Sequence, residues 1–363
     1  MTGKENGGSK IMNKLLFVTS DLRRGGAQRV ISLLANEYAK RGWNVHIAVL
    51  LDTGIGYEIS ESIHLHNIVR HGNYLINAAR WVKDVRKIIT KEKPDAIVAF
   101  AGRINIITML ASIGKKTPIM VSERNDPKND RRSRIEVLLC KYFYKKANKV
   151  VFQTSYQKEQ YGHACEKNGV VIGNPISAPV YEGEHIKRDI ICVGKLMDQK
   201  NHPMMIRAFA RLANQFPQKQ VYIYGDGSKQ DELQKLIDDL NMSSRIHLCG
   251  NSEHIFEIMR EYQYFVMCSD YEGLSNALLE AMISGMVCVT TAWNGVEEIV
   301  VDGENGYLVP VGNEDALVDK LRTVLDNDNS AITYKSIETA KRFASDNIMS
   351  IWRDTIDGLC KTC

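Results

Sequence analysis

Residues 264–290, YFVMCSDYEGLSNALLEAMISGMVCVT, contain two short apolar runs separated by a glycine loop and a helical segment. The runs Tyr264–Met267 and Val287–Thr290 have the length and the apolar character of buried strands. Glu272 lies in the loop after the first run, and Glu280 falls about one turn into the helix. A strand, a crossover helix and a second strand together predict a parallel sheet, which binds ligands beyond the carboxyl ends of its strands.

The same alternation recurs along the chain in two blocks. Residues 173–188 carry two prolines and two glycines with little periodicity, which predicts a linker between the blocks. We therefore predict an α/β protein with two Rossmann-like, doubly wound domains facing each other across a cleft. The predicted strands are residues 15–19, 45–51, 64–69, 96–100, 119–122 and 150–154, then 190–193, 220–224, 246–248, 264–267 and 287–290.

The domain boundaries follow from these blocks. The first domain is predicted over residues 12–174 and the second over residues 188–346. The leader, residues 1–11, is polar and glycine-rich, and we expect it to be disordered. A last helix lies within residues 347–363, and the sequence leaves open whether it packs back on the first domain.

Composition excludes several classes of protein. The chain has 363 residues, 44% hydrophobic and 25% charged, with a formal net charge of +4, which suits a soluble two-domain protein without a nucleic-acid partner. Residues 104–113 are too short an apolar stretch to cross a bilayer, and the leader lacks a signal-peptide core, so we predict a cytoplasmic protein. No metal site is predicted, because Asp326-Asn327-Asp328 suits a turn and the Cys360/Cys363 pair has no second pair.

Two further loops could hold a nucleotide diphosphate. Gly25 and Gly26 precede a predicted helix, where backbone amides and the helix start favour an anion. In the second domain, Gly194 is followed by Lys195 and Lys200 before a helix that starts near Pro203, and fixed ammonium groups there suit a diphosphate. A tight turn without a ligand and a solvated loop remain the alternatives for these two segments.

The opening segment is the most specific of the three. Gly273 and the amides of Leu274, Ser275 and Asn276 would form another anion-binding helix start. Glu272 and Glu280 would place carboxylates on either side of it, which suits a ligand with hydroxyl groups around a diphosphate, such as a nucleotide sugar. The alternative is that Glu280 only caps and solvates its helix.

Taken in order, these segments resemble family 4 of the glycosyltransferases, the retaining enzymes of the GT-B fold. Glu272 and Glu280 match the family's E-x7-E motif, and Gly194-Lys195-Leu196 with Lys200-Asn201 is similar to its G-R-L…K-N segment, with lysine in place of arginine. The match extends from about Asn13 to Trp352. Gly25-Gly26, Tyr224-Gly225-Asp226-Gly227, Asn294-Gly295-Val296-Glu297-Glu298 and Asp302-Gly303-Glu304-Asn305-Gly306 also follow the family pattern.

The resemblance implies a role for each residue. Glu280 would hold the ribose hydroxyls, Glu272 the hydroxyls of the donor sugar, and Lys195 and Lys200 the diphosphate. The donor is expected to be a nucleotide sugar, with uridine as the base, and no cofactor or metal is implied. The acceptor, a glycan or lipid-linked glycan, would bind mainly to the first domain. The full set of expected donor-binding residues is Gly25, Gly26, Gly194, Lys195, Lys200, Gly225, Gly250, Glu272, Gly273, Leu274, Ser275, Asn276 and Glu280.

The fifth predicted strand leads into Ser122-Glu123-Arg124-Asn125, where many relatives carry a histidine facing the donor sugar. This motif is similar to that of transferases of hexoses or N-acetylhexosamines in bacterial surface glycans, so Arg124 joins Glu272, Lys195 and Lys200 as an expected catalytic residue. A structural turn is the alternative.

Basic residues recur at helical spacing after this motif. We expect a stripe of Arg131, Arg134, Lys141 and Lys145, with Lys128, Arg132 and Lys146 close by, to rest on anionic lipid beside the acceptor. A solvated helix face is the alternative.

Two other classes of protein are compatible with parts of the pattern. A nicotinamide-dependent dehydrogenase would also be doubly wound, but the G-x-G-x-x-G fingerprint is absent after the first strand. A non-catalytic module that binds glycans or a partner would keep the fold without the donor residues, whereas the glutamates and lysines are intact here.

Overall fold

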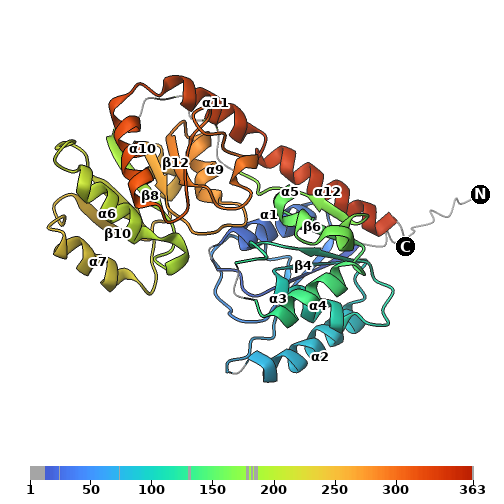
Figure 1. Cartoon of the computed structure of the whole chain (residues 1–363). Coiled ribbons are helices and arrows are strands. Elements are labelled where there is room, and N and C mark those ends of the chain that lie inside the picture. The colour runs from blue at the N-terminus through green and yellow to red at the C-terminus, as the bar shows by residue number, and fades with distance from the viewer. Residues whose placement is uncertain are drawn as a thin grey trace, which may run out of the picture.

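The computed structural model describes residues 13–361 except 24, 73, 130–131, 177–179, 181–182 and 184–186. Figure 1 shows two α/β units side by side, each with helices packed around a sheet. The predicted fold class, two parallel-sheet Rossmann-like domains, is confirmed.

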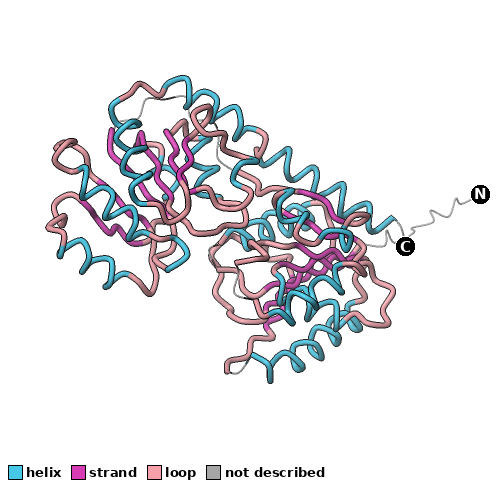
Figure 2. The backbone as a smooth tube through the Cα atoms, in the orientation of Figure 1, coloured by secondary structure: helices cyan, strands magenta, loops and turns pink. Residues whose placement is uncertain are grey.

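The first sheet has seven parallel strands in the order β3-β2-β1-β4-β5-β6-β7. Figure 2 shows its strands as one layer between helices. Its elements are β1 (Lys14–Thr19), α1 (Gly26–Lys40), β2 (Asn44–Val49), β3 (His64–Asn67), α2 (Tyr74–Glu92), β4 (Ala96–Phe100), α3 (Gly102–Ala111), β5 (Ile119–Ser122), α4 (Arg134–Tyr144), β6 (Lys149–Phe152), α5 (Ser155–Glu159) and β7 (Gly169–Val171).

The second sheet has six parallel strands in the order β10-β9-β8-β11-β12-β13. Its elements are β8 (Lys187–Val193), α6 (His202–Leu212), β9 (Val221–Tyr224), α7 (Gln230–Asp239), β10 (Ile246–Gly250), α8 (Ile255–Met259), β11 (Tyr262–Met267), α9 (Asn276–Ile283), β12 (Val287–Thr291), β13 (Tyr307–Val309), α10 (Glu314–Asp326) and α11 (Ser330–Lys341).

The central strands are buried on both faces. Leu16 and Val18 of β1 pack in one hydrophobic cluster, whereas Leu15 and Phe17 pack in the cluster on the opposite face. Alternate side chains of a strand point to opposite faces, so a strand covered by helices on both sides must be apolar throughout. This explains why the predicted strands appear in the sequence as continuous apolar runs.

Of the elements that were not predicted, three have a clear physical reason. β7 and β13 have three residues each, which is too short for a periodic pattern. α3 is buried on several sides, so its residues show no amphipathic stripe. Its apolar sequence belongs to a core helix, and among the described residues no helix is long and apolar enough to cross a membrane.

The chain crosses between the two domains twice, and the crossings run side by side. Ile176 donates its amide to the carbonyl of Phe343 at 2.8 Å, and Ser345 donates its amide to the carbonyl of Ile176 at 2.9 Å. The first crossing is slightly shorter than the predicted linker, because β8 already begins at Lys187.

The second crossing leads into the last helix, α12 (Ser345–Lys361), which packs on the first domain (Figure 1). Trp352 is fully buried and stacks on Phe100 at the end of β4, with 5.6 Å between the ring centres. The Tyr38 hydroxyl of α1 donates to Asp357 at 2.8 Å. The question that the sequence left open is therefore answered, since the last helix completes the core of the first domain.

Candidate active site

Loops from the carboxyl ends of both sheets meet at Asn174, three residues after β7. Its side chain, 2% exposed, donates to the carbonyl of Leu274 at 3.1 Å and to the Asn276 side chain at 2.6 Å. Its side-chain oxygen Oδ1 accepts a hydrogen bond from the Gln153 side chain at 2.9 Å and from the Arg124 side chain at 3.0 Å. One buried amide therefore connects two loops of the first domain to the start of α9 in the second.

The predicted diphosphate loop lies beside Glu272. Lys200 Nζ is 2.5 Å from Glu272 Oε1, and the two side chains are only 16% and 10% exposed. A Cβ on Gly194 would lie 3.2 Å from the Lys200 side chain, so this glycine leaves room for the lysine. Lys195, in contrast, is exposed. The structure thus brings Lys200 and Glu272 together and leaves Lys195 outside this contact.

Gly225 and Gly250 lie at the adjacent strand ends. Gly225 has φ +151, and a Cβ there would overlap the backbone carbonyl of Gly194. Its amide donates to the carbonyl of Gly250 at 2.8 Å, and Gly250 has φ +69. Gly225 therefore lets the ends of β8 and β9 lie against each other at the base of the Lys200 loop, whereas an added Cβ on Gly250 would meet no atom within 4 Å and this glycine serves its positive φ.

Glu280 forms an ion pair across the two domains. Its carboxylate contacts the guanidinium of Arg29 in α1, and the two side chains are 12% and 21% exposed. Burial raises the pKa of Glu280, and the charge of Arg29 opposes that shift. The predicted ribose-binding carboxylate is therefore held by a cation from the first domain.

The glycine loop of the first domain packs on the start of α9. A Cβ on Gly26 would lie 3.2 Å from the Asn276 side chain, and the Tyr57 hydroxyl hydrogen-bonds both the amide and the carbonyl of Gly25. Ser275 is the N-cap of α9, and its hydroxyl accepts from the Leu278 amide. The predicted anion-binding segments thus lie directly opposite each other.

Gly273 permits a close approach of the two domains. A Cβ at this position would lie 2.5 Å from the Arg124 carbonyl oxygen and 2.5 Å from Gln153 Oε1. Both atoms belong to the first domain, so any side chain at position 273 would separate the loops.

Arg124, predicted to be catalytic, lies at this contact. Its guanidinium carbon is 5.3 Å from the centre of the Phe100 ring, and Nη2 donates to Asn174. Nε and Nη1 are buried without a partner among the described residues. Burial lowers the pKa of Arg124 to about 9, although the adjacent Glu123 favours the charged form. A buried cation with unused donors is suited to an anionic or hydroxyl-rich ligand.

The basic stripe needs one correction. Arg134, Lys141 and Lys145 are exposed on or at the end of α4, while Arg131 lies outside the described residues. Arg132, which we placed beside the stripe, has a side chain only 3% exposed and pairs with Glu123 at 2.8 Å. It belongs to the interior because an adjacent buried carboxylate compensates its charge.

Sequence reasoning missed Arg29 and Asn174 as site residues. Arg29 stands three residues after Gly26, about one helical turn, and this spacing was a usable signal. Asn174 was assigned to the linker, and its contacts depend on how the two domains meet, which no local pattern reveals.

Two doubly wound domains with facing carboxyl-end loops form the GT-B fold of glycosyl-transferring enzymes. The lysine–glutamate pair and the second glutamate at a helix start fit this class. Comparison with sequence families agrees with this class. Residues 24–178 match the family described as Glycosyltransferase Family 4, and residues 181–343 match the family described as Glycosyl transferases group 1. The chain belongs to the family 4 glycosyltransferases and is a glycosyltransferase.

Several known proteins are similar over nearly the whole chain. An N-acetylgalactosamine-N,N'-diacetylbacillosaminyl-diphospho-undecaprenol 4-alpha-N-acetylgalactosaminyltransferase of Campylobacter jejuni is 29% identical, over 95% of this chain and 99% of its own. A second alpha-1,4-N-acetyl-D-galactosaminyltransferase of that organism is 23% identical, over 94% and 97%. The crystal structure of Anabaena HepE with UDP and glucose superposes with a TM-score of 0.81 at 19% identity, over 95% and 100% of the chains.

Proposed function

We propose that this enzyme transfers a hexose or N-acetylhexosamine, with retention, from a UDP-sugar to a hydroxyl group of a lipid-linked glycan in bacterial polysaccharide assembly. The observation that carries the proposal is the Lys200–Glu272 pair at 2.5 Å beside the start of α9. A diphosphate needs the cation, and sugar hydroxyls need the carboxylate. The two Campylobacter relatives are named for GalNAc transfer to undecaprenol-linked glycans, and HepE was crystallised with UDP, which supports both substrate classes.

In the proposed reaction, an acceptor hydroxyl displaces UDP from the anomeric carbon. The bond between that carbon and the diphosphate oxygen breaks, a new glycosidic bond forms, and the hydroxyl proton passes to a phosphate oxygen of the leaving group. Negative charge grows on the diphosphate, so Lys200 and the amides at the start of α9 stabilise the transition state more than the ground state. Closure of the domains over the substrates excludes water.

A thermal-shift panel of nucleotides and UDP-sugars, followed by transfer to an undecaprenyl-diphosphate glycan, tests the proposal. A ligand at 100 times its dissociation constant stabilises the native state by about 2.7 kcal/mol, so UDP and one UDP-sugar should raise the melting temperature. A shift with another nucleotide sugar alone would contradict the uridine assignment, and the absence of transfer with every sugar that binds would contradict the acceptor class.

We expect transfer to be independent of divalent metal. The cations of the site are side chains, and the group of described residues that could share a metal ion, His46, His66 and Glu92, is on β2, β3 and α2, outside the loops that meet at Asn174. Activity in EDTA should therefore equal activity in buffer, measured as UDP release. Loss in EDTA that magnesium or manganese restores would contradict the metal-free mechanism.

A membrane contact on α4 would bring such an acceptor to the site. Four apolar or aromatic side chains with i, i+3, i+4 and i+7 spacing are exposed along one stripe, at 69%, 66%, 37% and 54%. Exposed apolar side chains beside basic ones are typical of helices that lie in a lipid interface. The four are Ile135, Leu138, Leu139 and Tyr142, and they neighbour Arg134, Lys141 and Lys145.

Two changes separate the apolar and the charged contributions to this contact. The double change Ile135→Ser/Leu138→Ser should abolish sedimentation with both anionic and neutral liposomes. Reversing the charges of Arg131, Arg134, Lys141 and Lys145 should replace the attraction to anionic liposomes, about 1 kcal/mol per charge, by repulsion, while binding to neutral liposomes stays. Both variants should retain transfer to a water-soluble acceptor.

A matched control is Val301→Ser/Tyr334→Ser, because these side chains are exposed at 48% and 68% on the second domain. It should sediment as the wild type does. Unchanged sedimentation of the α4 variants would leave that helix as a solvated face.

A further inference from the structure

The loop that carries Arg124 is anchored by the carboxylate that precedes it. Glu123 follows β5 directly, is 1% exposed, and donates its amide to the carbonyl of Val151 in β6 at 2.8 Å. One carboxylate oxygen, Oε1, accepts from the Arg124 amide at 3.1 Å. Glu123 therefore holds the backbone of the residue whose carbonyl and guanidinium meet the second domain.

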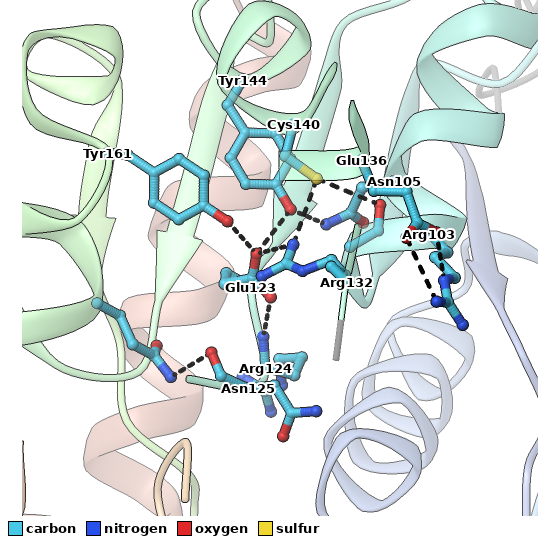
Figure 3. A network of polar contacts seen from close by, with 12 residues as sticks. Arg103, Asn105, Glu123, Arg124, Asn125, Arg132, Glu136, Cys140, Tyr144 and Tyr161 are labelled. Carbon is cyan, nitrogen blue, oxygen red and sulfur yellow. Dashed lines mark hydrogen bonds and ion pairs between the residues drawn. The ribbon is translucent and has the colours of Figure 1, made fainter. Parts of the chain in front are cut away.

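The other carboxylate oxygen is held by three donors. Glu123 Oε2 accepts from Arg132 Nη1 at 2.8 Å, from the Tyr144 hydroxyl at 3.1 Å and from the Tyr161 hydroxyl at 2.5 Å. Figure 3 shows these side chains converging on Glu123 from different segments of the first domain. Burial and the adjacent Glu123 charge raise the pKa of both tyrosines, so they remain hydroxyl donors.

The surrounding backbone is shaped for this cluster. A Cβ on Gly102, where α3 begins, would overlap the guanidinium of Arg132, so a larger residue here would displace that side chain. Asn105 of α3 donates both to the Tyr144 hydroxyl at 2.8 Å and to the carbonyl of Ser122 at 3.0 Å. Contacts from α3 and from Glu123 thus fix the end of β5. Of the two carboxylates labelled in Figure 3, Glu123 is the one that contacts the Arg124 backbone.

We propose that Glu123 is the positioning residue of the active site: its buried carboxylate fixes the Arg124 loop against Gly273 and Asn174 without touching the substrates. The proposal rests on the proposed transfer reaction. Replacing a buried ion pair by apolar groups often leaves the stability of the fold unchanged. Folding alone would therefore not require the charges of Glu123 and Arg132. Their charges instead position the Arg124 loop. A displacement of that loop by about 1 Å would lower the transfer rate about 10²-fold.

The test compares Glu123→Gln with Glu123→Gln/Arg132→Met. The single variant removes the carboxylate charge that faces the buried Arg132 guanidinium, so it should lower both the melting temperature and kcat. The double variant removes the buried cation and should recover most of the melting temperature, while kcat stays about 10²-fold below the wild type and KM for the donor changes little. Gly102→Ala, which displaces Arg132 while keeping Glu123, should lower kcat less than either variant.

Three outcomes are distinguishable. Recovery of kcat together with stability in the double variant would show that Glu123 only supports the fold, and would overturn the proposal. A donor KM that rises while kcat stays at the wild-type value would mean that Glu123 affects donor binding alone, which also overturns it. Absence of turnover by the wild type with every UDP-sugar would instead mean that the proposed function has failed.

Discussion

Lys200→Ala should lower kcat by about 10²–10³-fold, the loss seen when one donor to a developing charge is removed. In the proposed donor complex, Lys200 binds the diphosphate and Glu272 the sugar hydroxyls, and the two side chains are 2.5 Å apart. The charge on the diphosphate grows as the sugar leaves, so the loss should appear in kcat more than in KM. Glu272→Ala should affect both parameters, because sugar hydroxyls are bound in the ground state and the transition state.

The control for this series is Lys229→Ala. Lys229 pairs with Asp198 at 3.1 Å and Glu232 at 2.7 Å on the surface of the same domain, with its side chain 32% exposed. Its removal should leave kcat unchanged. Lys195→Arg restores the residue usual in the family. Because Lys195 is exposed, this change should alter kcat only slightly. Steady-state kinetics with folding checked by circular dichroism decides the series. A kcat near the wild-type value for Lys200→Ala would place the diphosphate in another loop.

Gly273→Ala should lower kcat by about 10²-fold with little change in melting temperature. Its methyl group would lie 2.5 Å from the Arg124 carbonyl oxygen and from Gln153, both in the other domain. The two domains can relieve the overlap by moving apart, which leaves each core intact. The change should therefore disturb the alignment of donor and acceptor, and a shift of about 1 Å in that alignment lowers the rate strongly.

The matched control is Gly358→Ala in α12, where an added Cβ meets no atom within 4 Å. It should keep full activity and stabilise slightly, by about 0.5–1 kcal/mol, since alanine favours a helix. Differential scanning fluorimetry and kinetics of both variants test the pair. A large loss of melting temperature in Gly273→Ala, matching its loss of rate, would contradict a purely interdomain effect.

Much of the fold is visible in the sequence because a parallel sheet covered on both faces produces continuous apolar runs. The runs at β1, β4 and β11 were found for this reason. β7 and β13 were not predicted, because three residues are too few to show a periodic pattern. α3 was not predicted, because a helix buried on several sides has no single apolar stripe. Propensity and pattern describe single elements and cannot report how the last helix docks.

The candidate site was predicted in part for a similar reason. Lys200 and Glu272 each lie in a loop whose own sequence carries a local signature. Arg29 and Asn174 act across the two domains, and Arg132 was misplaced because helical spacing cannot tell an outward arginine from one paired with a buried carboxylate. The roles of all these residues toward substrates remain predictions.

The return of α12 to the first domain has a consequence for how the protein is made. Trp352 stacks on Phe100, and Ile356 and Leu359 join the same cluster of the first domain. During synthesis, the first domain leaves the ribosome with this apolar face open, and the second domain must be translated before α12 can close it. At about 5–20 residues per second this interval lasts roughly 10–40 s. The N-terminal half is therefore an incomplete folding unit until α12 has been translated.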